Sequence, residues 1–299
     1  MDEPIIYPRY KVSRDGSNLY LRLFVALAND EKDEFMRLIK DPGFEEVRDS
    51  FTANKIFSED ALEIAITVFN GKTKGLIDIE DVLKDGMTPL HLAVIHRAPR
   101  LTKYLLQRGD KVDAICDHKK LNLEHATPID LSICNIAPGY SRTLFDILWW
   151  VCFHNRDQME IIRMLVRSKQ NTTWSSHTLF NYAYKGELHK LAALFLAVPE
   201  LFLSSQESGE LSLLSKLDLK LNSLENKTDN EKLLSLLLDV FALVGVKLAT
   251  YIRLEEFAVK SRTKKEIDQT HLEIDFFLRE VARKKLGVLS PDYYLRFVY

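Results

Sequence analysis

The sequence predicts an all-α protein, made of about five degenerate helix pairs stacked as a solenoid and followed by a C-terminal helical bundle. Apolar residues recur at helical spacing along most of the chain, and glycine occurs only 11 times in 299 residues. A turn that leads into a helix at 85–93 is followed by a second helix, and weaker copies of this pattern occur on both sides. An apolar content of 46% is sufficient for one large core or for two domains.

The clearest helix pair begins with the segment Asp-Gly-Met-Thr-Pro-Leu-His-Leu-Ala at 85–93. Its Asp-Gly pair suits a turn, the Thr88 hydroxyl can cap a helix, and Pro89 fits a first helical position because no partner is needed for its missing N–H. Apolar spacing predicts a second helix over 100–107, ended by Gly109 in a left-handed conformation. A pair of this size cannot bury its own apolar stripe, so we expect neighbouring pairs to cover it.

These residues resemble an ankyrin repeat, which combines a Thr-Pro-Leu-His turn, two short antiparallel helices and a closing Leu-Leu-x-x-Gly over about 33 residues. The resemblance implies a structural hydrogen-bonding role for His91. The next unit begins 39 residues further on, at Thr127, with Asp130 in place of the family's histidine. Its second helix is expected at 158–165, after an insertion at about 137–157.

Three further units are expected from spacing more than from motif. They are a pair at 19–39 broken at Asn29-Asp30, a collapsed unit at 61–65 with 71–82, and a pair at 177–183 with 186–191. Such a degenerate array with added helices resembles plant-type ankyrin repeat proteins.

The expected domains are an N-terminal extension at 1–18, a repeat array at 19–203 and a C-terminal helical region at 204–299. Helices are predicted there at 211–224, 230–260 and 265–286. They either cap the last repeat or fold as a separate domain.

Charge and motif content favour a binding protein over an enzyme. The 41 basic and 43 acidic side chains nearly cancel, so no global field would attract nucleic acid. No glycine-rich phosphate loop and no nucleophile motif occurs, and we therefore expect no catalysis, no cofactor and no small-molecule substrate. Three cysteines and the absence of a signal pattern at the N-terminus predict the cytoplasm or the nucleus.

Two alternatives compete with this interpretation. The apolar segment 233–252 could anchor a signalling protein in a membrane, but Asp239 and Lys247 would each cost about 2.5 to 3.5 kcal/mol near the bilayer centre. The cysteines and histidines between Cys116 and His154 could bind a metal or serve an enzyme, but they lack the spacings of structural zinc sites. We therefore expect a core helix in the first case and no metal in the second.

The predicted function is that of a non-enzymatic scaffold or adaptor that binds another protein. The resemblance places the binding surface on the concave face, formed by turn tips and by the exposed ends of first helices. The positions on this sequence are Lys84, Asp85, Met87, Ile95, His96, Glu124, Trp174, Tyr184 and Lys185. A mixture of charge and large apolar groups suits a protein partner. Trp149 and Trp150 in the insertion are either buried or an exposed anchor, and burial of at least one is expected.

Overall fold

The computed structural model describes residues 18–118, 123–136, 144–168, 187–199, 202, 212–223, 229–242, 272, 276 and 279. The chain divides into two compact units, the first ending at Leu131 and the second beginning at Ser132. Their boundary falls inside a helix that the sequence assigned to the fourth repeat. The predicted domain limits at 18/19 and 203/204 stay predictions.

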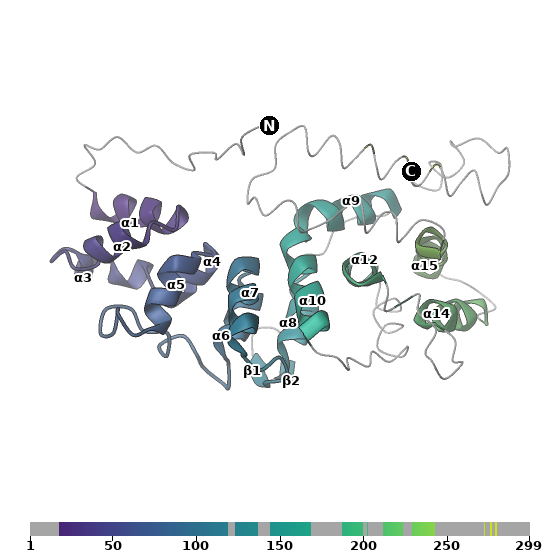
Figure 1. Cartoon of the computed structure of the whole chain (residues 1–299). Coiled ribbons are helices and arrows are strands. Elements are labelled where there is room, and N and C mark those ends of the chain that lie inside the picture. The colour runs from purple at the N-terminus through teal and green to yellow at the C-terminus, as the bar shows by residue number, and fades with distance from the viewer. Residues whose placement is uncertain are drawn as a thin grey trace. The chain divides into compact units, whose positions relative to one another are not determined.

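The first unit consists mainly of short helices (Figure 1). In chain order these are α1 (Leu19–Ala28), α2 (Lys32–Leu38), α3 (Phe44–Val47), the 3₁₀-helix η1 (Arg48–Ser50), α4 (Ala53–Ser58), α5 (Leu62–Phe69), α6 (Pro89–Ile95) and α7 (Pro99–Arg108). Three helix pairs pack internally, α1 with α2, α4 with α5 and α6 with α7. Second helices also pack on one another, α2 on α5 and α5 on α7, and α4 packs on α6.

All three pairs have the same turn between their helices. Asp30, Asp60 and Arg97 each adopt a left-handed backbone, with φ of 58°, 52° and 56°. In each turn the N–H of this residue donates to the carbonyl three positions back, and the next N–H donates five positions back. This is the Schellman arrangement, which satisfies the last carbonyls of a helix and reverses the chain.

The second helix pair differs from the sequence prediction. Residues 61–65 were expected to begin a first helix, but they belong to α5, the second helix, and α4 precedes it. The expected partner segment 71–82 forms turns. The reason is Gly71, whose φ of 69° ends α5 in the same Schellman arrangement, so the following residues cannot continue a helix.

A short antiparallel hairpin follows α7. Strand β1 (Cys116–His118) pairs with β2 (Leu123–Ala126), with an irregularity in the register between the pairs Cys116–Ala126 and His118–Leu123. The described residues are thus mostly helical, as predicted, but the all-α prediction overlooked this hairpin. Helix α8 (Pro128–Cys134) follows directly.

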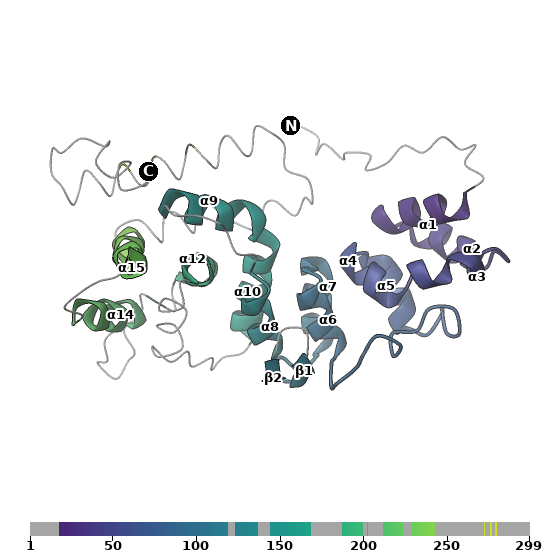
Figure 2. The ribbon, with the colours of Figure 1, turned by 180° about the vertical axis from the view of Figure 1, so that it is seen from behind.

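In the second unit, α12 (Leu188–Ala197) packs on α9 (Leu144–His154), α10 (Arg156–Ser168) and α15 (Asp229–Val240). Figure 2 shows α12 between these three helices. Almost every side chain of α12 is buried, because the sequence of this helix is apolar on all sides. The Phe195 ring stacks on Phe241 with 3.6 Å between centroids, which joins α12 to the end of α15.

The helices predicted in the C-terminal region are present where residues are described, and the predicted bundle stays a prediction. Helix α14 (Leu213–Asn222) lies within the predicted 211–224 and packs on α15, and α15 covers the first part of the predicted 230–260. Residues 272, 276 and 279 of the predicted 265–286 are helical. Most of that last segment lies outside the described residues.

Candidate partner-binding surface

The turn before α6 is fixed by local hydrogen bonds and by close packing on the hairpin. The Met87 N–H donates to the Lys84 carbonyl at 2.9 Å, and the Asp117 N–H donates to the Asp85 carbonyl at 2.9 Å. Gly86 has φ of 81°, and a Cβ at this position would lie 3.1 Å from the Ile115 carbonyl oxygen. Only glycine meets both requirements at low cost.

The start of α6 carries the predicted cap in a reciprocal form. The Thr88 N–H donates to His91 Nδ1 at 3.1 Å, and the His91 N–H faces Thr88 Oγ1 at 3.4 Å. Pro89 occupies the first helical position, as expected. Helix α7 ends at Gly109 with φ of 91°, which confirms the left-handed cap.

His91 also connects this helix pair to the next one. Its side chain is fully buried, and Nε2 lies 3.3 Å from the Ala126 carbonyl oxygen at the end of β2. Because Nδ1 accepts from Thr88, the proton must reside on Nε2, which then donates to Ala126. Burial lowers the pKa of His91, and the carbonyls of Ala126 and Ala114 oppose that shift. The structural role expected for His91 is confirmed.

Asp130 stands where the predicted fourth repeat departs from the family's histidine, and it keeps the capping part of the histidine's role. Its carboxylate accepts from the Thr127 N–H at 2.9 Å and from the Thr127 hydroxyl at 2.6 Å. A carboxylate can complete the cap in this way. Unlike His91, however, it has no ring N–H that could donate to a following hairpin.

Six of the nine predicted binding residues are described, and they fall into two groups. Lys84 and Asp85 are exposed and Met87 is half-buried in the turn before α6, and Glu124 is exposed on β2. We call these four residues, together with Ile115, the tip group. Ile115, 55% exposed beside Gly86, was missed because helical periodicity does not reveal an apolar loop residue.

The second group lies at the other end of α6. Ile95 and His96 are half-buried, and His96 Nε2 lies 3.3 Å from Asn54 Oδ1 at the start of α4. Burial lowers the pKa of His96. Since α6 has 7 residues and a helix rises about 1.5 Å per residue, about 10 Å separates its two ends. Asn54 was missed because its helix was not recognised in the sequence.

Trp174, Tyr184 and Lys185 lie outside the described residues. The insertion does contain a helix, α9, on which Trp149 and Trp150 are both half-buried. The Trp150 ring stacks on His154 with 3.6 Å between centroids. Neither tryptophan is therefore completely buried or fully exposed.

The cysteines and histidines of 116–154 are not gathered into a metal site in the described part of the chain. Among those residues no three His, Cys, Asp or Glu side chains are placed to hold an ion. Cys116 is buried, and burial raises the pKa of its thiol, with Asp117 and Asp85 adding to the shift. Such a thiol is mostly protonated at neutral pH and is a poor nucleophile.

No helix within the described ranges combines the length and the apolar character needed to cross a bilayer. Of the apolar segment 233–252, residues 233–240 belong to α15, and 243–252 lie outside the described residues.

Comparison with protein families gives a match to the ankyrin repeat at residues 85–117. The match begins at Asp85 and ends in β1, so it covers the turn, α6, α7 and the first strand of the hairpin. The resemblance seen in the sequence is therefore confirmed for this repeat, and the degenerate helix pairs around it are consistent with an array. Comparisons with curated proteins and with solved structures give no match.

Proposed function

We propose that this protein is a non-enzymatic scaffold or adaptor that binds another protein through its ankyrin-repeat region. The observation that carries the proposal is the repeat at 85–117, because ankyrin repeats generally serve as interaction modules without catalytic activity. We infer that the helix pairs form a solenoid, which the packing of α2 on α5 and of α5 on α7 supports. The C-terminal region from 204 onward is proposed to act as a helical bundle.

The tip group is the proposed centre of the binding surface. Hydrogen bonds to Lys84 and Asp85 fix the backbone of the turn, while the side chains of both residues remain exposed. A surface that is already ordered loses little conformational entropy when a partner binds. Rigid display of these side chains is therefore the proposed mechanism.

The composition of the tip group fits a protein partner. Ile115 and Met87 supply apolar area, and Lys84, Asp85 and Glu124 supply charges of both signs. A nucleic acid would instead require an excess of lysine and arginine facing its phosphates. We infer a location in the cytoplasm or nucleus, which the absence of a disulfide among Cys116, Cys134 and Cys152 supports.

Site-specific crosslinking tests the proposal. A photoreactive amino acid is placed at Lys84, Met87 or Glu124 of the full chain, and in separate controls at Lys103, which is exposed on α7 outside both groups. We expect the three tip positions to capture the same protein and the control position not to capture it. Equal capture from all four positions would contradict the proposed surface.

The captured protein is then purified and its affinity measured by calorimetry. We expect Asp85→Lys to weaken binding by about fivefold or more, the effect of losing roughly 1 kcal/mol at an interface. Lys103→Glu should leave the affinity unchanged. If both variants bind as the wild type does, the tip group is not the interface.

A further inference from the structure

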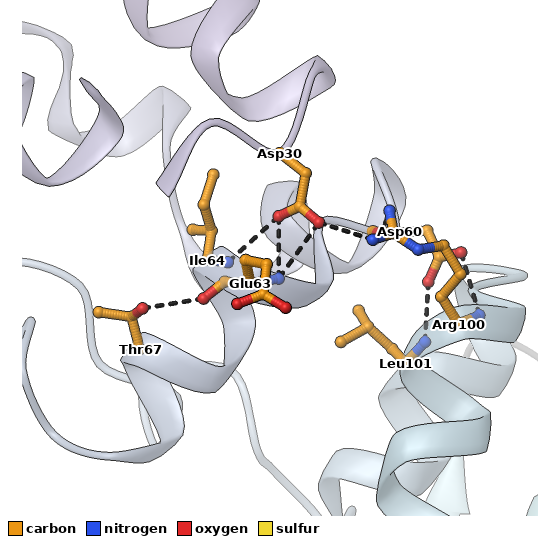
Figure 3. A network of polar contacts seen from close by, with 7 residues as sticks. All are labelled: Asp30, Asp60, Glu63, Ile64, Thr67, Arg100 and Leu101. Carbon is orange, nitrogen blue, oxygen red and sulfur yellow. Dashed lines mark hydrogen bonds and ion pairs between the residues drawn. The ribbon is translucent and has the colours of Figure 1, made fainter. Parts of the chain in front are cut away.

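Helix α5 receives its N-terminal cap from the preceding helix pair. The residue at its own cap position is Ala61, which has no side-chain oxygen to accept from the free N–H groups of the first turn. Asp30 takes this role: its Oδ1 accepts from the Glu63 N–H at 2.9 Å and from the Ile64 N–H at 3.2 Å (Figure 3). The turn of the first pair thus caps the second helix of the second pair.

Helix α7 repeats this arrangement one pair further along. Its cap position is Ala98, and the carboxylate of Asp60 accepts from the Arg100 N–H at 3.1 Å and the Leu101 N–H at 2.9 Å. Asp60 is 2% exposed, so these bonds are shielded from water. Aspartate therefore occupies a left-handed turn position that favours glycine, and its carboxylate bonds the next pair.

Arg100 connects both turns. Its Nη1 donates to the Asp60 carbonyl oxygen at 3.2 Å, and its Nη2 donates to Asp30 Oδ2 at 2.8 Å. In Figure 3 the Arg100 side chain extends from α7 toward both aspartates. The Asp30 side chain is only 10% exposed and that of Arg100 is 45% exposed. A residue of the third helix pair thereby bonds the first pair directly, past the intervening one.

We propose that Asp30, Asp60 and Arg100 form an inter-repeat strap that couples opening of the first helix pair to the third. In repeat proteins each unit ordinarily contacts only its neighbours, and the terminal unit opens most easily. The Arg100–Asp30 bond adds an interaction between units that are not neighbours. It opposes independent opening of α1 and α2 and holds the spacing between the three pairs. The strap does not depend on the proposed binding role.

Hydrogen exchange of the full chain, followed by mass spectrometry, tests the strap. Arg100→Met removes the guanidinium but keeps the backbone N–H that Asp60 accepts. We expect exchange of the α1 and α2 amides to rise about three- to fivefold, as fits the loss of a partly exposed ion pair, while α6 stays as protected as before. Lys103→Met is the matched control, since it removes an exposed cation from the same helix.

A second variant tests the specific pair. Asp30→Asn keeps an oxygen that can cap α5 but removes the charge that Arg100 contacts. We expect the same rise in α1 and α2 exchange, and no further rise when Arg100→Met is added, because both changes break the Arg100–Asp30 bond and the second Arg100 bond, to the Asp60 carbonyl oxygen, does not reach the first pair. The strap is refuted if Arg100→Met matches Lys103→Met in α1 and α2, if protection falls equally in α4 to α7, or if the two effects multiply.

Discussion

Replacing Asp60 tests how much a cap supplied by a neighbouring repeat contributes to stability. The buried carboxylate accepts two backbone N–H groups of α7, whose own cap position is alanine. Hydrogen bonds to a charged group contribute about 1.5 to 3 kcal/mol each, and two bonds to one carboxylate do not add fully. Asp60→Gly should therefore lower the free energy of unfolding by about 2 to 3 kcal/mol.

Asp60→Ala should cost about 1 kcal/mol more than Asp60→Gly, because alanine is strained at the φ of 52° that glycine adopts freely. Asp60→Asn keeps one acceptor oxygen and tolerates this backbone, so it should cost the least of the three.

The assay is urea unfolding followed by circular dichroism, with hydrogen exchange of α7 to locate the effect. Asp33→Ala, at an exposed position of α2, serves as the control and should change stability by less than about 0.5 kcal/mol. If Asp60→Gly is as stable as the wild type, relief of backbone strain outweighs the cap, and the reasoning is refuted.

Three further predictions concern other parts of the molecule. Because the pKa of His91 is lowered in the folded state, its neutral form stabilises the fold above about pH 6.5, and stability should fall as the pH drops toward the folded pKa. In His91→Asn, the free energy of unfolding, measured by urea titration at several pH values, should change less steeply with pH than in the wild type. An unchanged dependence on pH would contradict this. Gly86→Ala should lower the thermal midpoint more than Gly75→Ala, because both have positive φ but only Gly86 faces a nearby carbonyl; equal shifts would contradict the close contact. Phe195→Ala should cost about 3 to 5 kcal/mol in unfolding experiments, since it empties a stacked, buried site against Phe241; a loss under about 1 kcal/mol would show that the site repacks.

The repeat at 85–117 could be recognised from sequence because its signals are local. Thr88, Pro89 and Gly109 act within one helix or one turn, so each residue type indicates its own conformation. Asp130 illustrates the same point: it departs from the family pattern, and the chemistry of a carboxylate is still sufficient for the cap. Of the six described residues that were predicted to bind a partner, the structure places five around the two ends of α6 and Glu124 on β2, and their binding role stays a prediction.

The second helix pair was misassigned because the deciding feature is not local. In isolation, 61–65 suits a first or a second helix equally well, and only the preceding α4 and the left-handed Gly71 distinguish the two. Ile115 and Asn54 were missed for a related reason. An apolar loop residue or a polar helix residue becomes a surface candidate only when packing shows what surrounds it.

By itself, the sequence determined the helical character of the chain, the ankyrin turn and the caps that each helix carries in its own residues. Only the tertiary structure decided which helices pair and how successive pairs are bonded together. In the sequence, Asp30, Asp60 and Arg100 look like ordinary charged residues, separated by 30 and 40 positions. The Arg100 guanidinium meets the Asp30 carboxylate and the Asp60 carbonyl oxygen because packing of the helix pairs brings each turn against the start of a neighbouring helix. No local sequence pattern encodes this proximity.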